Sequence, residues 1–263
     1  MPALISKAAG SIAVLLLATV SFAAKPVKIE SGAIVYKMGP GTFEGLVARP
    51  AKKSGKLPAI LMIHNWMGVT AETKKQAERM ASLGFVVLAA DIYGQGVRPK
   101  TREEASALAG KFKADRPLFR EHLNHGLKAL TSQPGVDPSR VFAVGYCFGG
   151  TGALELARSG ADVKGVVSFH GGLDSPSPAD GANIKAKVLV LHGADDPFVK
   201  LDDIVAFQKE LRDHKVDWQM ISFGGAVHSF TDTGAGNDPA SGAAYNAVAD
   251  ARSFAAFREF VVP

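Results

Sequence analysis

The chain has 263 residues, 47% of them hydrophobic, and carries a formal net charge of +5. That length suits one large α/β domain and provides enough apolar residues for a sizeable core. Basic residues are scattered along the chain instead of being clustered on one segment, which argues against a nucleic-acid-binding protein.

The first 23 residues have the pattern of a signal peptide. Lys7 provides a positive start, Ile12–Val20 is a short apolar run, and the small residues Ser21 and Ala23 precede a cleavage point. The run is too short for a comfortable membrane span, although a buried N-terminal helix is the alternative. We therefore expect an exported protein, periplasmic or secreted, with no membrane association after the signal is removed.

Residues 27–262 are expected to form a single domain. Val27–Arg49 alternates in polarity and contains glycines, which predicts two strands of an antiparallel hairpin. Apolar runs of strand length then alternate with helix-period segments. The strands are predicted at residues 57–64, 85–91, 140–146, 163–171, 185–193 and 217–225. The helices are predicted at residues 70–84, twice within 102–131, and at 148–159, 202–214 and 245–260.

This alternation predicts an α/β fold with a mostly parallel central sheet and helices on both faces. In such folds the functional residues gather beyond the carboxyl ends of the strands. The loops after the predicted strands are therefore where a site is expected.

The only cysteine, Cys147, lies between Gly145 and Gly149, at the junction of a predicted strand and a predicted helix. Glycines at these positions permit the sharp turn that exposes a nucleophile, and the N–H of Phe148 then faces the same space as an oxyanion-hole donor. The helix N-terminus would favour the thiolate. The alternative is a small buried residue in a tight turn.

A nucleophilic thiol needs a base, and His228 is the best placed of the seven histidines. It follows the last predicted strand, so that nucleophile, acid and histidine occur in the chain order of α/β-hydrolases. The acid is expected in "LHGADDPFV", where Asp196 is preferred to Asp195 by its spacing from the loop glycine. His64, His170 and His192 also follow strands, and could line the crevice or satisfy loop hydrogen bonds.

The loop after the first central strand, "HNWMG", is expected to provide the second oxyanion-hole donor through the N–H of Trp66. Tyr93 follows the next strand, and its ring is a candidate for the wall of a substrate pocket.

These residues resemble the dienelactone hydrolase family, whose members have the α/β-hydrolase fold and a cysteine nucleophile. The motifs that carry the resemblance are "HNWMG", "AADIYG", "GYCFGG", "SFHGG", "LHGADDPFV" and "HSF". The resemblance implies catalytic roles for Cys147, Asp196 and His228, a thioester acyl-enzyme, and neither a metal nor a cofactor.

Two departures from the family pattern concern the substrate. Asn65 stands where the family commonly has a glutamate that helps to activate the thiol, and an amide cannot accept a proton. Gln95 and Asp232 stand where arginines would hold the carboxylate of dienelactone, although Arg98 could replace the first. The resemblance therefore predicts a substrate other than dienelactone, or a neutral relative of it.

The sequence thus predicts an exported, cysteine-dependent hydrolase of small carboxylic esters or lactones. One alternative is a non-catalytic protein of the hydrolase fold that binds a small molecule or a protein. Another is a thiol-based redox protein, although no second cysteine is present to resolve a disulfide. The sequence leaves the oligomeric state open.

Overall fold

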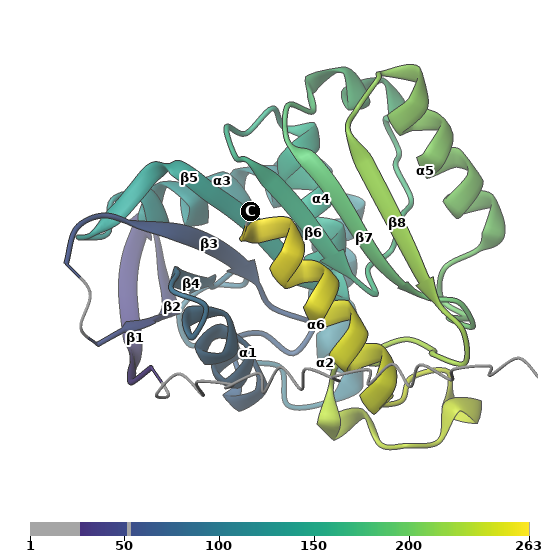
Figure 1. The fold of residues 1–263 in the computed structure, drawn as a ribbon, viewed down its shortest axis with the longest axis horizontal. Coiled ribbons are helices and arrows are strands. Elements are labelled where there is room, and N and C mark those ends of the chain that lie inside the picture. Colours follow the sequence, from purple (N-terminus) through teal and green to yellow (C-terminus); the bar gives the residue numbers. More distant parts are fainter. Residues whose placement is uncertain (1–26, 52–53, 263) are drawn as a thin grey trace, which may run out of the picture.

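The computed structural model describes residues 27–51 and 54–262, so the predicted signal peptide at residues 1–23 lies outside the described residues. The strands form one eight-stranded sheet in the order β1-β2-β4-β3-β5-β6-β7-β8 (Figure 1). They are β1 (Ile29–Met38), β2 (Gly41–Pro50), β3 (Leu57–Ile63), β4 (Val86–Ala90), β5 (Val136–Tyr146), β6 (Gly165–Phe169), β7 (Lys187–Gly193) and β8 (Trp218–Phe223).

The first two strands form the predicted antiparallel hairpin, and β2 is also antiparallel to β4. All other pairings are parallel, from β4 across to β8. The helices are α1 (Ala71–Ala81), α2 (Arg102–Ala114), α3 (Arg116–Thr131), α4 (Phe148–Arg158), α5 (Leu201–Asp213) and α6 (Ala247–Val261). The predicted mostly parallel α/β sheet is therefore confirmed.

Two hydrophobic cores lie on the two faces of the sheet. Helices α1 and α6 cover one face, and α2, α3, α4 and α5 cover the other (Figure 1). Alternate residues of β3 serve the two cores: Leu61 packs on the four-helix side and Met62 on the other. Because both faces are covered, the central strands are continuous apolar runs instead of alternating ones. Each fully buried side chain of this size contributes about 1.5–3 kcal/mol to folding.

The strand and helix predictions differ from the structure mainly at their ends. Strand β8 stops at Phe223, before the two glycines that the prediction had included. Strand β5 starts at Val136, earlier than predicted, across a register irregularity in its pairing with β3. Three short 3-10 helices in the loops were not predicted, at Pro178–Asn183, Thr233–Ala235 and Pro239–Ser241. Within residues 27–51 and 54–262, no helix has the length and apolar character needed to cross a bilayer.

Candidate active site

Cys147 lies at a sharp turn between β5 and α4. Its φ is 55°, in the left-handed region that non-glycine residues rarely adopt. The turn demands glycine on both sides of the cysteine: a Cβ at Gly145 would lie 1.8 Å from the carbonyl oxygen of Gly149, and a Cβ at Gly149 would lie 2.2 Å from that of Ile63. The glycines flanking the thiol are therefore required by close backbone contacts.

The thiol, the imidazole of His228 and the carboxylate of Asp196 lie in a hydrogen-bonded row. The Nε2 atom of His228 is 3.0 Å from Cys147 Sγ, and its Nδ1 atom is 2.7 Å from Asp196 Oδ2. The second carboxylate oxygen of Asp196 accepts the N–H of Phe198 at 2.9 Å. Asp195 instead accepts the N–H of Gly225 at 2.9 Å, in a turn. Of the two neighbouring aspartates, the structure thus brings Asp196 to the ring.

The loop that carries His228 is tied to a later segment of the chain. The N–H of His228 donates to the carbonyl of Gly242 at 3.1 Å, and the N–H of Ala244 donates to the carbonyl of His228 at 3.0 Å. These two hydrogen bonds hold the backbone of His228 in place, so the ring is positioned next to the thiol without a bound substrate.

The charges of the pair favour a thiolate and an imidazolium. Burial by itself raises the pKa of the Cys147 thiol, but the charge of His228 and hydrogen bonds from its ring and from the N–H of Phe148 bring that pKa below its ordinary value. Burial lowers the pKa of His228, whereas the Cys147 thiolate and the Asp196 carboxylate raise it, and the net shift is upward. Both shifts favour the thiolate, which is the nucleophilic form of a cysteine.

Two backbone N–H groups face the region above the sulfur. The N–H of Phe148 is the first of helix α4, directly after Cys147, and it contributes to lowering the pKa of the thiol, so it lies close to the sulfur. Trp66 lines the same cavity, and its N–H has no acceptor among the described residues. The Trp66 carbonyl accepts the Tyr93 hydroxyl at 2.9 Å, which holds this loop in place. Both predicted donors are thus available to a substrate.

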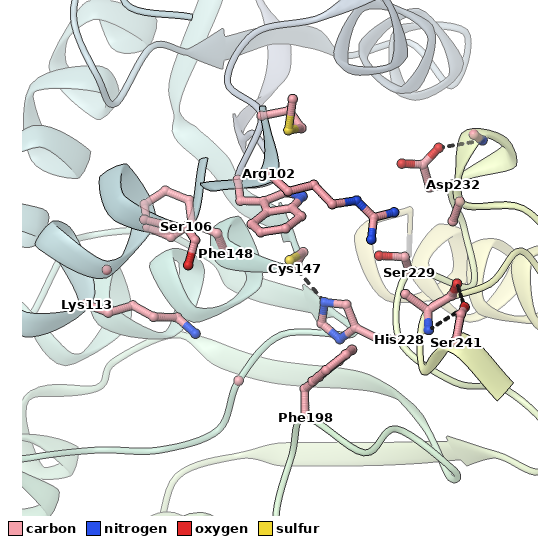
Figure 2. A pocket seen from close by; sticks show the side chains of 18 of the residues that line it. Arg102, Ser106, Lys113, Cys147, Phe148, Phe198, His228, Ser229, Asp232 and Ser241 are labelled. Carbon is pink, nitrogen blue, oxygen red and sulfur yellow. Dashed lines mark hydrogen bonds between the residues drawn. The ribbon is translucent and has the colours of Figure 1, made fainter. Parts of the chain in front are cut away.

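A cavity of about 670 Å³ opens over the thiol and is large enough for a small organic ester (Figure 2). Its aromatic and apolar lining includes Trp66, Met67, Phe148, Phe198, Val199 and Ala243. Its charged lining consists of Lys100, Arg102, Lys113 and Asp232, besides His228.

The other predicted pocket residues do not line this cavity. Gln95 donates to Glu44 Oε2 at 3.1 Å on the surface. The guanidinium of Arg98 bonds the Glu44 carbonyl at 2.9 Å and lies 3.4 Å from Asp91 Oδ1, so it serves the β4 loop. Tyr93 is buried beneath the cavity wall, where its ring packs on Phe148 with centroids 5.7 Å apart. Of these three side chains, only Tyr93 contacts a residue of the cavity lining, through Phe148 and the Trp66 carbonyl.

Asn65 makes its hydrogen bonds within the turn that contains it. Its side-chain oxygen accepts the N–H of Met67 at 2.9 Å, and its carbonyl accepts the N–H of Gly68 at 3.2 Å. It borders a second, smaller cavity of about 70 Å³ that also reaches Cys147. The residue in the position of the family glutamate is therefore near the thiol but shapes the loop that presents Trp66.

His64 and His170 are buried and line the smaller cavity, whereas the buried His192 lines neither cavity. The Nδ1 atom of His64 is 2.6 Å from the Asn65 carbonyl, its Nε2 atom accepts the Ile92 N–H at 3.2 Å, and burial lowers its pKa to about 4. His170 packs edge-on against His228 with centroids 5.3 Å apart, and burial keeps its pKa well below the ordinary value. A neutral His170 adds no positive charge beside the imidazolium.

Sequence reasoning missed the contribution of helix α2 to the cavity. Arg102, Ser106 and Lys113 line it, although the chain between residues 102 and 131 was interpreted only as two helices. Their spacing of four and seven residues places them on one helix face, and that was the available signal. No group of three metal-ligating side chains comes together within the described part of the chain.

Comparison with known proteins gives consistent matches. A model of the dienelactone hydrolase family matches residues 43–262. A solved structure of a dienelactone hydrolase-like promiscuous phosphotriesterase from metagenomic libraries is 39% identical, covers 89% of this chain and 97% of its own, and superposes with a TM-score of 0.83. This likeness confirms the α/β-hydrolase fold.

Two curated proteins are also similar to this chain. A probable 2-oxo-3-(5-oxofuran-2-ylidene)propanoate lactonase of Bradyrhizobium is 28% identical over 194 residues, which is 70% of this chain and 77% of that protein. An uncharacterized protein of Caenorhabditis elegans is 37% identical over 148 residues, which is 54% of this chain and 92% of that protein.

Proposed function

Because this chain belongs to the dienelactone hydrolase family, we propose that it hydrolyses small carboxylic esters and lactones with Cys147 as the nucleophile. The observation that carries the proposal is the row from Sγ through the His228 ring to Asp196, with contacts of 3.0 and 2.7 Å, beneath a cavity of about 670 Å³. A hydrogen-bonded thiol, base and carboxylate in an accessible cavity is the arrangement that nucleophilic catalysis needs.

In the first half of the reaction, the Cys147 thiolate attacks the carbonyl carbon of the ester. The negative charge that develops on the carbonyl oxygen is stabilised by the N–H groups of Phe148 and Trp66. The C–O bond then breaks as the His228 imidazolium gives its proton to the departing alkoxide. The products of this half-reaction are an alcohol and a thioester on Cys147.

In the second half, His228 is neutral and accepts a proton from a water molecule that attacks the thioester. The sulfur leaves as a thiolate, the carboxylic acid is released, and the protonated ring pairs again with the sulfur. Asp196 holds the imidazole in one orientation and stabilises its charged form in both halves.

The proposal is tested by mixing the protein with p-nitrophenyl acetate. We expect a stoichiometric burst of p-nitrophenol and the addition of one acetyl group to Cys147, detected by mass spectrometry. Cys147→Ala and His228→Ala should abolish the burst. An unchanged burst in Cys147→Ala would contradict the assignment, and tight ligand binding without any burst would favour the non-catalytic binding protein.

A matched pair of variants tests the role of Asp196. Asp196→Asn should lower kcat by about a hundredfold or more, because the ring loses its orienting carboxylate. Asp195→Asn changes the adjacent residue, whose carboxylate only closes a turn with Gly225, and should leave kcat close to that of the wild type. Equal losses in the two variants would remove the basis for choosing Asp196.

We also propose that the protein is exported, because residues 1–23 combine a basic start, a short apolar run and a small-residue cleavage point. Expression of the full chain in a bacterial host should yield a periplasmic or secreted protein that starts at Ala24. Recovery of the uncleaved chain in the cytoplasm would contradict export.

A further inference from the structure

One face of helix α2 forms a wall of the cavity. It presents Arg102, Ser106, Ala109, Gly110 and Lys113 to the space above the thiol. The residues in the middle of this face are small and leave room for a ligand, whereas the two ends are cationic. In Figure 2, Lys113 extends toward the space beside Cys147, whereas the Arg102 guanidinium extends toward Ser229 and Asp232.

The two cations are not neutralised within the protein. Among the described residues, no carboxylate lies within ion-pair distance of Lys113 or Arg102. Asp174 is the nearby carboxylate: a Cβ on Gly172 would lie 3.2 Å from its Oδ1 atom, but its other oxygen pairs with Arg116 and it makes no ion pair with Lys113. Asp232 is the one carboxylate in the cavity lining, and it accepts the N–H of Gly234 at 2.8 Å.

The surroundings of Lys113 provide space for an anionic group. A Cβ placed on Gly172 would lie 3.7 Å from Lys113 Nζ, so the absence of a side chain there leaves the ammonium accessible. Gly172 lines the cavity together with Lys113 and Cys147. The charge of Lys113 also contributes to lowering the pKa of the Cys147 thiol, which places the ammonium within electrostatic reach of the sulfur.

We propose that Lys113 binds a carboxylate on the acyl part of the substrate, so that this hydrolase prefers anionic esters and lactones to neutral ones. The proposal rests on the function proposed above and concerns which substrates the same site accepts. The expectation of a substrate other than dienelactone, or a neutral relative of it, considered only the positions of Gln95, Arg98 and Asp232. A lysine on α2 supplies the positive charge that those positions do not provide.

The test compares two esters that differ only in charge. The mono-p-nitrophenyl ester of glutaric acid and p-nitrophenyl valerate have acyl chains of equal length and the same leaving group. We expect wild-type kcat/KM to be higher for the glutarate ester. Lys113→Met should lower the ratio of the two kcat/KM values by about tenfold, mostly through KM for the glutarate ester, because a charge-assisted contact is lost.

Three further variants make the result specific to charge at this position. Lys113→Glu should lower the ratio below that of Lys113→Met, and Lys113→Arg should restore most of it. Lys111→Met removes a lysine of the same helix that does not line the cavity, and it should leave the ratio unchanged. A ratio that is the same in Lys113→Met, Lys113→Glu and the wild type would overturn the proposal.

The outcome for wild-type protein separates the two proposals. If valerate and glutarate esters are both hydrolysed through Cys147 with equal kcat/KM, the inference about charge fails and the hydrolase assignment stands. If neither ester forms an acyl-enzyme or is hydrolysed, the proposed function fails, and the inference fails with it.

Discussion

At the scale of single residues, the site depends on how two titrating groups change each other. Alone and buried, the Cys147 thiol would hold its proton more tightly and the His228 ring would lose its own more readily. Because Sγ and Nε2 lie 3.0 Å apart, each charge stabilises the other. The pKa of the thiol is lowered and that of the ring is raised, which favours a thiolate–imidazolium ion pair. Asn65 does not contribute a base, so the activation of the thiol falls to His228.

The pH dependence of thiol alkylation tests this pairing. The lowered pKa of Cys147 means that its thiolate persists below the ordinary cysteine value of about 8.5, so alkylation by iodoacetamide should remain fast at pH values where an ordinary cysteine has slowed. In His228→Ala the pKa should rise, because burial then acts without the charge and hydrogen bond of His228, the largest opposing effects, and alkylation should need a higher pH. Identical pH profiles for the two proteins would contradict the ion pair.

The residues of the row were predictable because their order along the chain is informative, whereas Lys113 was not. Cys147, Asp196 and His228 each follow an apolar strand, and parallel strands bring their carboxyl ends to one edge. Lys113 lies near the end of an amphipathic helix, where a lysine usually means solvent or the helix dipole. Which helix covers the cavity is decided by packing across the sheet, and one-dimensional spacing does not contain that information.

At the scale of elements, helix α4 combines the active site with a buried charge network. Its N-terminus begins directly after Cys147, and its middle is completely buried. There Glu155 accepts from Arg116 at 3.1 Å, from Arg120 at 2.8 Å and from Arg158 at 2.9 Å. Arg158 also bonds both carboxylate oxygens of Glu210 on α5, at 2.7 and 2.8 Å. The helix is thus fixed to its neighbours by charges as well as by apolar packing.

Removing the Glu155 carboxylate at the centre of this network should destabilise the protein. Glu155→Ala removes the buried carboxylate that three guanidinium groups share, leaving each with one remaining partner, and should lower the free energy of unfolding by about 3 kcal/mol. Urea unfolding followed by circular dichroism measures the change. Asp137→Ala breaks an exposed pair with Arg140 and serves as the control, with little expected change. Similar stabilities for the two variants would show that the network contributes no more than a surface pair.

The sequence predicted the buried strands but not the short 3-10 helices in the loops. Apolar runs predicted strands β3, β4, β6 and β7 nearly at their observed positions, because continuous apolar runs of this length are typical of strands that are buried on both faces. The 3-10 helices at Thr233–Ala235 and Pro239–Ser241 carry no apolar period. They were missed because their shape follows from side-chain caps, such as the Asp232 and Asp238 carboxylates that accept the N–H of Gly234 and Ala240.

At the scale of the whole molecule, two cores around one sheet hold three loops in unfavourable backbone conformations. Cys147, His170 and Ser229 have φ values of 55°, 40° and 58°, although none is glycine. All three surround the His228 ring. Conformations of this kind cost about 1–3 kcal/mol each and persist because the surrounding structure imposes them.

On heating, we therefore expect catalytic activity to be lost at a lower temperature than secondary structure. Hydrolysis of p-nitrophenyl acetate, assayed at each temperature, should fall away several degrees below the midpoint of the loss of helical circular dichroism, because local opening of these loops relieves strain. The control is Cys147 alkylation, which should accelerate over the same interval as the sulfur leaves the ring. Coincident curves for activity and circular dichroism would show that the loops and the sheet melt together.

The left-handed backbone at Cys147 has a practical consequence for handling this protein. Because the strained turn at Cys147 persists only while the surrounding loops hold it, we expect activity to be lost on storage before secondary structure or solubility changes. Titration of active centres, and not absorbance, is the right measure of how much working enzyme a preparation contains.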